Sequence, residues 1–133
     1  MLLITSATLA QTNQRSDSSC GTLGFACGIV GSTTESTLKM IQCANRKDKA
    51  MLLHWLNSSN PQDKVHGYVG LYFMERDGNK LTRKEKRIMK HTRDLNLYVS
   101  YCEGCDIGNK EKLNILLSKE KLAEFYRYYI ESN

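Results

Sequence analysis

Proline, long apolar runs and N-terminal positive charge are all scarce in this chain of 133 residues. No stretch approaches the ~18 to 20 apolar residues that a membrane span requires, so we expect no transmembrane helix. One proline and nine glycines exclude a collagen-like or low-complexity chain. The hydrophobic share of 41% is ordinary and indicates a folded protein. The length fits a single domain with a sizeable core.

The motifs of common enzyme classes are also missing. No serine lies in a Gly-x-Ser-x-Gly elbow. The segment 28–33 is rich in glycine, but it lacks the lysine and the spacing of a phosphate-binding loop. No pair of carboxylates stands out from the charged background. We therefore favour a non-enzymatic protein that binds no cofactor.

The first ten residues are apolar or small and give way abruptly to the polar run 11–19. Thr8 and Ala10 fit the small-x-small pattern that signal peptidase recognises before Gln11. This pattern predicts that 1–10 is the remnant of an export signal, although no Lys or Arg precedes it. The alternative is an N-terminal strand or frayed apolar arm. On this reading, 11–31 is a polar and Gly-rich leader, and 32–133 is a single helical domain.

Capping residues predict a series of helices. Helices are expected from Thr33 or Thr34 to Ala44, from Asp48 through Leu56, over 61–77, from Thr82, and from Ser118 to the end. The run 97–101 is the best strand candidate, and 114–117 is its expected partner. The predicted fold class is mainly α, a small helical bundle with one short β-hairpin near 97–117.

The helix over 61–77 carries apolar residues around most of its circumference, which predicts a central, buried helix. Gly67 and Gly70 would weaken it, so we expect a neighbouring helix to approach closely there. Leu38 is expected to face inward on the first helix. His54 is expected at the core or its boundary, whereas His66 and His91 are expected to face solvent.

Residues 48–94 carry a pattern of a helix, an Asn-Pro turn and a second helix. Leu52 and Leu56 precede the turn 58–61, and Tyr68 and Leu71 follow it. This pattern resembles the turn and second helix of a HEAT-type helical repeat. The resemblance implies two helices packed antiparallel, with protein binding as the usual function, and it carries no catalytic residues. A solenoid is not expected, because such arrays usually need three or more units.

Positive charge is concentrated in 80–93, which holds seven bases and one acid within a chain of net charge +5. The rest of the chain is about neutral, so attraction to an anionic partner is expected to be local to this segment. The segment predicts a basic helix that binds nucleic acid or another anionic partner, or else an ordinary solvated helix face. The candidate anion-binding residues are Arg83, Lys86, Arg87, Lys90 and Arg93.

The cysteines carry the sharpest chemical signal. Cys102 and Cys105 form a CxxC pair, but no βαβ pattern and no downstream proline support a thioredoxin-type site. A zinc site needs a second ligand pair, and the spacing of Cys20 and Cys27 is wider than usual. In an oxidising compartment, we expect Cys102 to pair with Cys105 and two of the others to pair together, with one left over. Buried reduced thiols are the alternative for all five candidates, Cys20, Cys27, Cys43, Cys102 and Cys105.

Three functions remain open at this point. The first is an exported helical domain, periplasmic or secreted, with a protein-binding or structural role in the cell envelope. The second is a cytoplasmic binding module that uses 80–93 on nucleic acid or another anionic partner. The third is a thiol or zinc site at Cys102 and Cys105.

Overall fold

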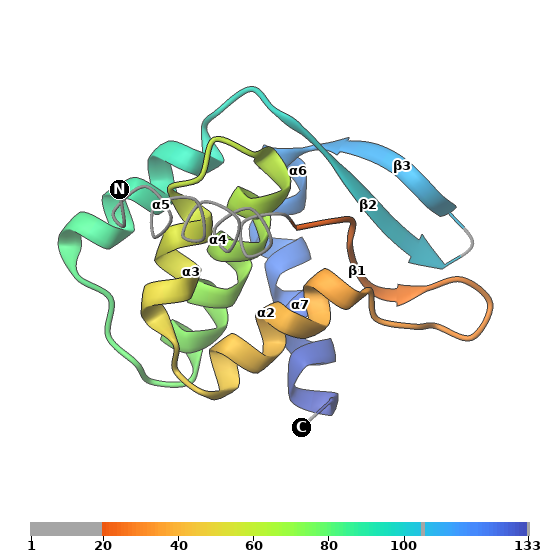
Figure 1. The fold of residues 1–133 in the computed structure, drawn as a ribbon, viewed down its shortest axis with the longest axis horizontal. Helices are drawn as coiled ribbons and strands as arrows, with labels where there is room; N and C mark the ends of the chain where they lie inside the picture. Colours follow the sequence, from red (N-terminus) through yellow and green to blue (C-terminus); the bar gives the residue numbers. More distant parts are fainter. Residues whose placement is uncertain (1–19, 105, 133) are drawn as a thin grey trace, which may run out of the picture.

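The computed structural model describes residues 20–104 and 106–132, which form a mainly helical body with a small sheet at one end (Figure 1). The predicted helical class is confirmed, but the sheet has three strands rather than two, so the fold is a small mixed α/β fold. The expected signal and the polar run before Cys20 lie outside the described residues. The elements in chain order are β1 (Leu23–Cys27), α2 (Glu35–Asn45), α3 (Lys49–Leu56), α4 (Pro61–Arg76), α5 (Arg83–Arg93), β2 (Tyr98–Gly104), β3 (Asp106–Lys112), α6 (Leu113–Leu116) and α7 (Lys119–Glu131).

Except for the short α6, the helices of the described residues begin at side-chain caps that the sequence predicts. Each cap accepts a hydrogen bond from a backbone N–H in the first turn, which would otherwise have no partner. Thr82 and Glu85 form the full capping box, in which each side chain bonds the other residue's backbone N–H. The other caps are Thr34, Asp48, Asn60 and Ser118.

The central helix is α4, as expected. Val65, Val69 and Phe73 are each 0% exposed. A Cβ on Gly67 would lie 2.5 Å from the backbone N of Leu56 and 2.6 Å from the carbonyl O of Leu52. The glycine therefore allows α3 to pack directly against α4, and the short turn between them makes the pair antiparallel.

The predicted hairpin is present, but with a different second strand. β2 pairs antiparallel with β3, from Tyr98 opposite Lys112 to Glu103 opposite Asp106. The expected partner, 114–117, is wrong: Leu113 and Leu116 lie three residues apart and are both 0% exposed, with α6 between β3 and α7. This spacing fits one face of a helical turn better than alternate positions on a strand.

The third strand, β1, was not predicted. It pairs in parallel with β2, with Leu23 opposite Tyr101, and so places residues 23–27 of the expected Gly-rich leader in the sheet. Leu23 is 0% exposed, and the ring of Phe25 stacks on Phe125 with centroids 4.9 Å apart. On α7, Phe125 and Tyr129 are 1% and 2% exposed and belong to the core.

Hydroxyl groups at the start of α2 cover the outer edge of β1. Thr34 Oγ1 donates to the carbonyl of Thr22 at 2.7 Å, and Thr33 Oγ1 donates to that of Phe25 at 3.0 Å. The backbone N of Gly24 donates to Thr37 Oγ1 at 2.9 Å. Thr37 occupies the buried position at this turn of α2. Leu38, the next residue, therefore points outward and is 46% exposed, so the expectation that it faces inward is wrong.

Candidate functional site

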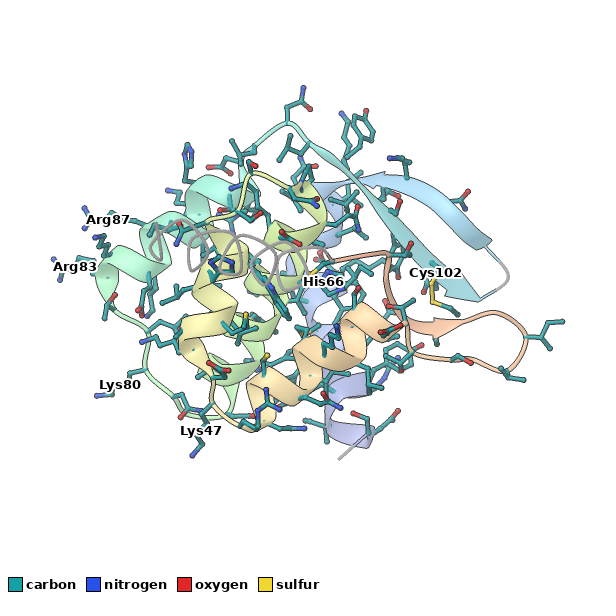
Figure 2. The ribbon with its side chains drawn as sticks, viewed as in Figure 1. Lys47, His66, Lys80, Arg83, Arg87 and Cys102 are labelled. Carbon is teal, nitrogen blue, oxygen red and sulfur yellow. A yellow bond between two sulfur atoms is a disulfide. The ribbon has the colours of Figure 1, made fainter. Side chains whose placement is uncertain are left out.

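A disulfide joins the two parallel strands. Cys27 on β1 bonds Cys102 on β2, with their Cα atoms 5.5 Å apart and a sequence separation of 75 (Figure 2). The expected pairing of Cys102 with Cys105 is therefore wrong for Cys102, and Cys105 itself lies outside the described residues. Proximity in sequence favoured the CxxC pair, whereas the parallel register of β1 on β2 brings Cys27 alongside. A Cβ on Gly24 would collide with both sulfur atoms, so the bridge also depends on that glycine.

The two other described cysteines are free thiols with weak acidity. Burial and the neighbouring carboxylate of Asp63 raise the pKa of Cys20 to about 12. Burial and the nearby Asp48 raise the pKa of Cys43. Because the thiolate is the reactive form, neither residue resembles an activated nucleophile. Within 20–104 and 106–132, no three His, Cys, Asp or Glu side chains gather as metal ligands would.

A buried polar cluster at the start of α4 was not predicted. Asp63 is 0% exposed, and its two carboxylate oxygens accept from the backbone N of Cys20 and from Ser58 Oγ, each at 2.7 Å. The side chain of Gln62 donates to the carbonyl of Gly21 at 2.8 Å and accepts from the backbone N of Ser100 at 2.5 Å. Through these hydrogen bonds, the first turn of α4 connects residues 20–21, which lead into β1, with Ser100 in the middle of β2.

His66 belongs to the same buried cluster. It is 0% exposed, so the expectation that it faces solvent is wrong. Its Nδ1 lies 2.8 Å from the carbonyl O of Gln62 and its Nε2 lies 3.1 Å from Thr37 Oγ1. Since a carbonyl only accepts, Nδ1 carries the proton and Nε2 accepts from the threonine. Burial lowers the pKa of His66 to about 4, so the ring is neutral at pH 7.

One signal in the sequence pointed to a buried His66. The residue lies on a helix whose apolar arc spans most of the circumference, so no broad face of α4 was left for solvent. His54 lies at an exposed position of α3, so the expectation that it lies at the core or its boundary is wrong.

The five anion-binding candidates all lie on α5, but they do not share one environment. Arg83 and Arg87 point away from the body into solvent (Figure 2). Lys86 forms an ion pair with Glu75 at 3.1 Å. Arg93 lies against Tyr68, where its charge opposes the burial that raises the pKa of that phenol. Among the described residues, Arg83, Arg87 and Lys90 form no ion pair, and their spacing places them on one exposed face.

A shallow cavity runs between α4 and α5. Its volume is about 190 Å³, and it contains three of the five candidates together with one carboxylate. The cations outnumber the acid there, so the cavity walls favour an anionic group. The lining residues are Tyr68, Glu75, Lys86, Met89, Lys90 and Arg93.

No family model, curated protein or solved structure matches this chain. The resemblance of α3 and α4 to a HEAT-type helical repeat therefore stays a prediction from the sequence. None of the helices in the described part of the chain is long and apolar enough to cross a membrane.

Proposed function

We propose that this chain is a non-enzymatic binding domain of an oxidising, extracytoplasmic compartment, where it binds another protein in the cell envelope. The observation that supports this proposal most is the disulfide between Cys27 and Cys102. Disulfides persist in secreted and periplasmic proteins and are rare in the reducing cytosol. This bridge holds the N-terminal strand in the sheet, so it serves the fold directly.

The placement of the polar groups also favours binding over catalysis. His66 and Asp63 are completely buried, and their hydrogen bonds hold β1 and the turn before α4. Cys20 and Cys43 are weakly acidic thiols. Asp63 and His66 are thus used to fix the fold rather than to meet a substrate.

The test is a mass measurement on protein expressed from its own gene. Free thiols are alkylated before lysis, and the protein is then digested without reduction. We expect a peptide that links Cys27 to Cys102, and alkylation of Cys43 only after unfolding, because that thiol is 5% exposed. Cell fractionation shows where the linked form resides. Alkylated Cys27 and Cys102 in the native protein, or recovery with the cytosolic fraction, would contradict the proposal.

A second candidate function is binding of nucleic acid or another anionic partner through α5. The observation that favours it is the exposed face of Arg83, Arg87 and Lys90, which are not neutralised by any ion pair among the described residues. If these three bases contact phosphates, raising salt from about 50 to about 200 mM weakens binding about 40-fold. Fluorescence anisotropy with a labelled DNA duplex measures this dependence.

Charge reversal separates this site from general attraction to a basic protein. The variant R83E/R87E/K90E is compared with K39E/K110E/K119E, which makes the same change in net charge at exposed positions elsewhere. We expect only the first variant to lose binding. Equal losses in both variants, or affinity that is insensitive to salt, would exclude a specific site on α5.

A further inference from the structure

The side of α5 that borders the cavity next to α4 carries its own line of basic residues. Lys86, Lys90 and Arg93 lie at positions i, i+4 and i+7, so they follow one another along the helix. They lie beside Met89, which is 7% exposed and belongs to the core. Lys90 is the one residue that this line shares with the exposed basic face of α5 described above.

The cavity between α4 and α5 offers two positive charges to a ligand. Three cations and one carboxylate line it, which gives the lining a formal charge of +2. Lys86 and Glu75 form an ion pair at 3.1 Å and cancel each other, so Lys90 and Arg93 supply the charge that remains. Arg93 Nε lies 3.9 Å from Asp94, but water screens this contact because the two side chains are 42% and 63% exposed.

A buried phenol adds a neutral hydrogen-bond donor to the same cavity. Tyr68 is 6% exposed and lines the cavity together with Arg93. Burial raises the pKa of Tyr68, although the Arg93 guanidinium beside it acts in the opposite direction, so the phenol is protonated at pH 7 and can donate. An ammonium, a guanidinium and a hydroxyl thus line one cavity of about 190 Å³.

This set of donors matches a phosphate monoester. A phosphoryl group held by one ester oxygen carries about 1.5 to 2 negative charges at pH 7 and three strong acceptor oxygens. A carboxylate carries one charge and two oxygens, and each phosphate of a nucleic-acid backbone carries one charge. Either of these would leave one of the two cations without a partner. The planar guanidinium also suits the paired oxygens of a phosphoryl group.

A second cavity beside the first provides space for the rest of such a ligand. Its volume is about 360 Å³, and it shares Lys86 and Glu75 with the first cavity. Its lining includes the buried Leu81 together with Asn79 and Lys80, which lies on the connection between α4 and α5 (Figure 2). The first cavity is smaller than the roughly 300 Å³ at which pockets for whole ligands begin, which suits a single phosphoryl group.

We propose that the cavity between α4 and α5 binds the phosphoryl group of a small organic phosphate monoester, with Lys90, Arg93 and Tyr68 as its donors. The body of the ligand lies in the second cavity. This site goes beyond the protein-binding function proposed above, which needs neither cavity. It is also distinct from the exposed face of α5, which carries Arg83 and Arg87.

Titration of the purified full chain with defined ligands gives the first test, with NMR of the backbone amides as the readout. The probe is phenyl phosphate. Phenyl sulfate has the same shape and three terminal oxygens but only one charge, and benzoate is the carboxylate control. We expect phenyl phosphate to shift the amide signals of 86–93 and to bind about tenfold more tightly than either control, because it gains one further charged interaction. Equal affinity for phenyl phosphate and phenyl sulfate, or shifts centred elsewhere, would overturn the proposal.

A pair of double variants separates the cavity from general attraction to a basic helix. K90Q/R93Q removes the two cations of the cavity, and R83Q/R87Q makes the same change in net charge on the exposed face. We expect K90Q/R93Q to weaken phenyl phosphate binding about 100-fold, since two charged hydrogen bonds are lost, and R83Q/R87Q to bind as the wild type does. Equal losses in the two variants would overturn the site.

Tyr68→Phe tests the neutral donor and keeps the buried ring. We expect phenyl phosphate to bind about tenfold more weakly, as the loss of one hydrogen bond to a charged group predicts. Thermal unfolding checks that each variant folds. If K90Q/R93Q is unstable, K90Q and R87Q, both at exposed positions, give the same comparison one charge at a time. Wild-type affinity in the Tyr68→Phe protein would overturn the assignment of the donors.

Discussion

At the scale of single residues, His66 is the clearest case of a polar side chain used for structure. The ring joins α4 to α2 through Thr37, and the same threonine accepts from the backbone of Gly24 on β1. One hydroxyl therefore connects a helix, a second helix and a strand in a region that water does not reach. Removing one member of such a network leaves the others buried without partners, which costs about 1 to 3 kcal/mol per group.

The buried histidine makes the stability of the fold depend on pH. The pKa of His66 is lowered from 6.5 to about 4 in the folded chain. Between these values the unfolded chain binds a proton that the folded chain does not. The contribution of the neutral His66 ring to stability is therefore fully present above pH 6.5 and is lost as the pH drops toward 4. We expect the free energy of unfolding to lose about 3 kcal/mol over this range through His66 alone.

Urea unfolding from pH 4 to pH 7.5 measures this loss, with H66Q as the variant that cannot titrate and H54Q as the control at an exposed position. The H54Q protein is expected to follow the wild type, and H66Q to vary less steeply with pH. The same slope in H66Q and wild type would assign the pH dependence to other groups.

At the scale of elements, the contact of α3 with α4 is set by the glycines of α4. At Gly67 a side chain would meet backbone atoms of Leu52 and Leu56, which cannot move aside. At Gly70 a Cβ would instead lie 2.5 Å from Leu52 Cδ2, the end of a flexible side chain. The two positions therefore differ in how easily the neighbouring helix can adjust.

Alanine substitution ranks these positions. Alanine favours helix by about 1 kcal/mol over glycine, but overpacking typically costs 1 to 3 kcal/mol and more against backbone. We expect Gly67→Ala to lower the free energy of unfolding by about 2 kcal/mol or more and Gly70→Ala to lower it less. Gly21→Ala, which meets only Ser36 Oγ at 3.4 Å, is expected to change little. Thermal unfolding gives the order, and a Gly67→Ala protein as stable as the wild type would contradict the close approach.

The elements also show what the sequence predicts well. Thr34, Asp48, Asn60, Thr82 and Ser118 mark the starts of helices correctly, because a cap depends on residues within one turn. The sequence did not predict β1, because its partner β2 lies far along the chain and no local pattern indicates this pairing. The same distance concealed the bridge from Cys27 to Cys102. In the basic segment, the sequence located the helix and its charges, but the pairing of Lys86 with Glu75 depends on tertiary packing.

At the scale of the whole molecule, the disulfide joins the first described strand, β1, to β2. It closes a loop of 75 residues that contains α2, α3, α4 and α5. Cross-linking a loop of this length restricts the unfolded chain strongly, and the loop-entropy relation gives about 4 kcal/mol of stabilisation. The bridge is therefore expected to contribute much of the net stability of a domain of this size.

Reduction tests this contribution directly. We expect the variant C27S/C102S to lose about 4 kcal/mol of unfolding free energy relative to the oxidised wild type. A thiol reductant is expected to lower the melting temperature of the wild type and leave that of the variant unchanged, which separates the bridge from any effect of the serines. A wild-type protein that melts at the same temperature with and without reductant would contradict a stabilising bridge.

The parallel pairing of β1 with β2 also governs the order in which the chain can fold during its synthesis. β1 leaves the ribosome before the helices α2 to α7, yet its neighbour in the sheet follows only after α5 has been made. Until then Cys27 can form a non-native disulfide with Cys20 or with Cys43, which lie 7 and 16 residues away in sequence. Both pairings have to be avoided. Correct folding thus requires the earliest strand to wait for one of the latest, and it gives the cell a reason to control when, as well as where, these cysteines are oxidised.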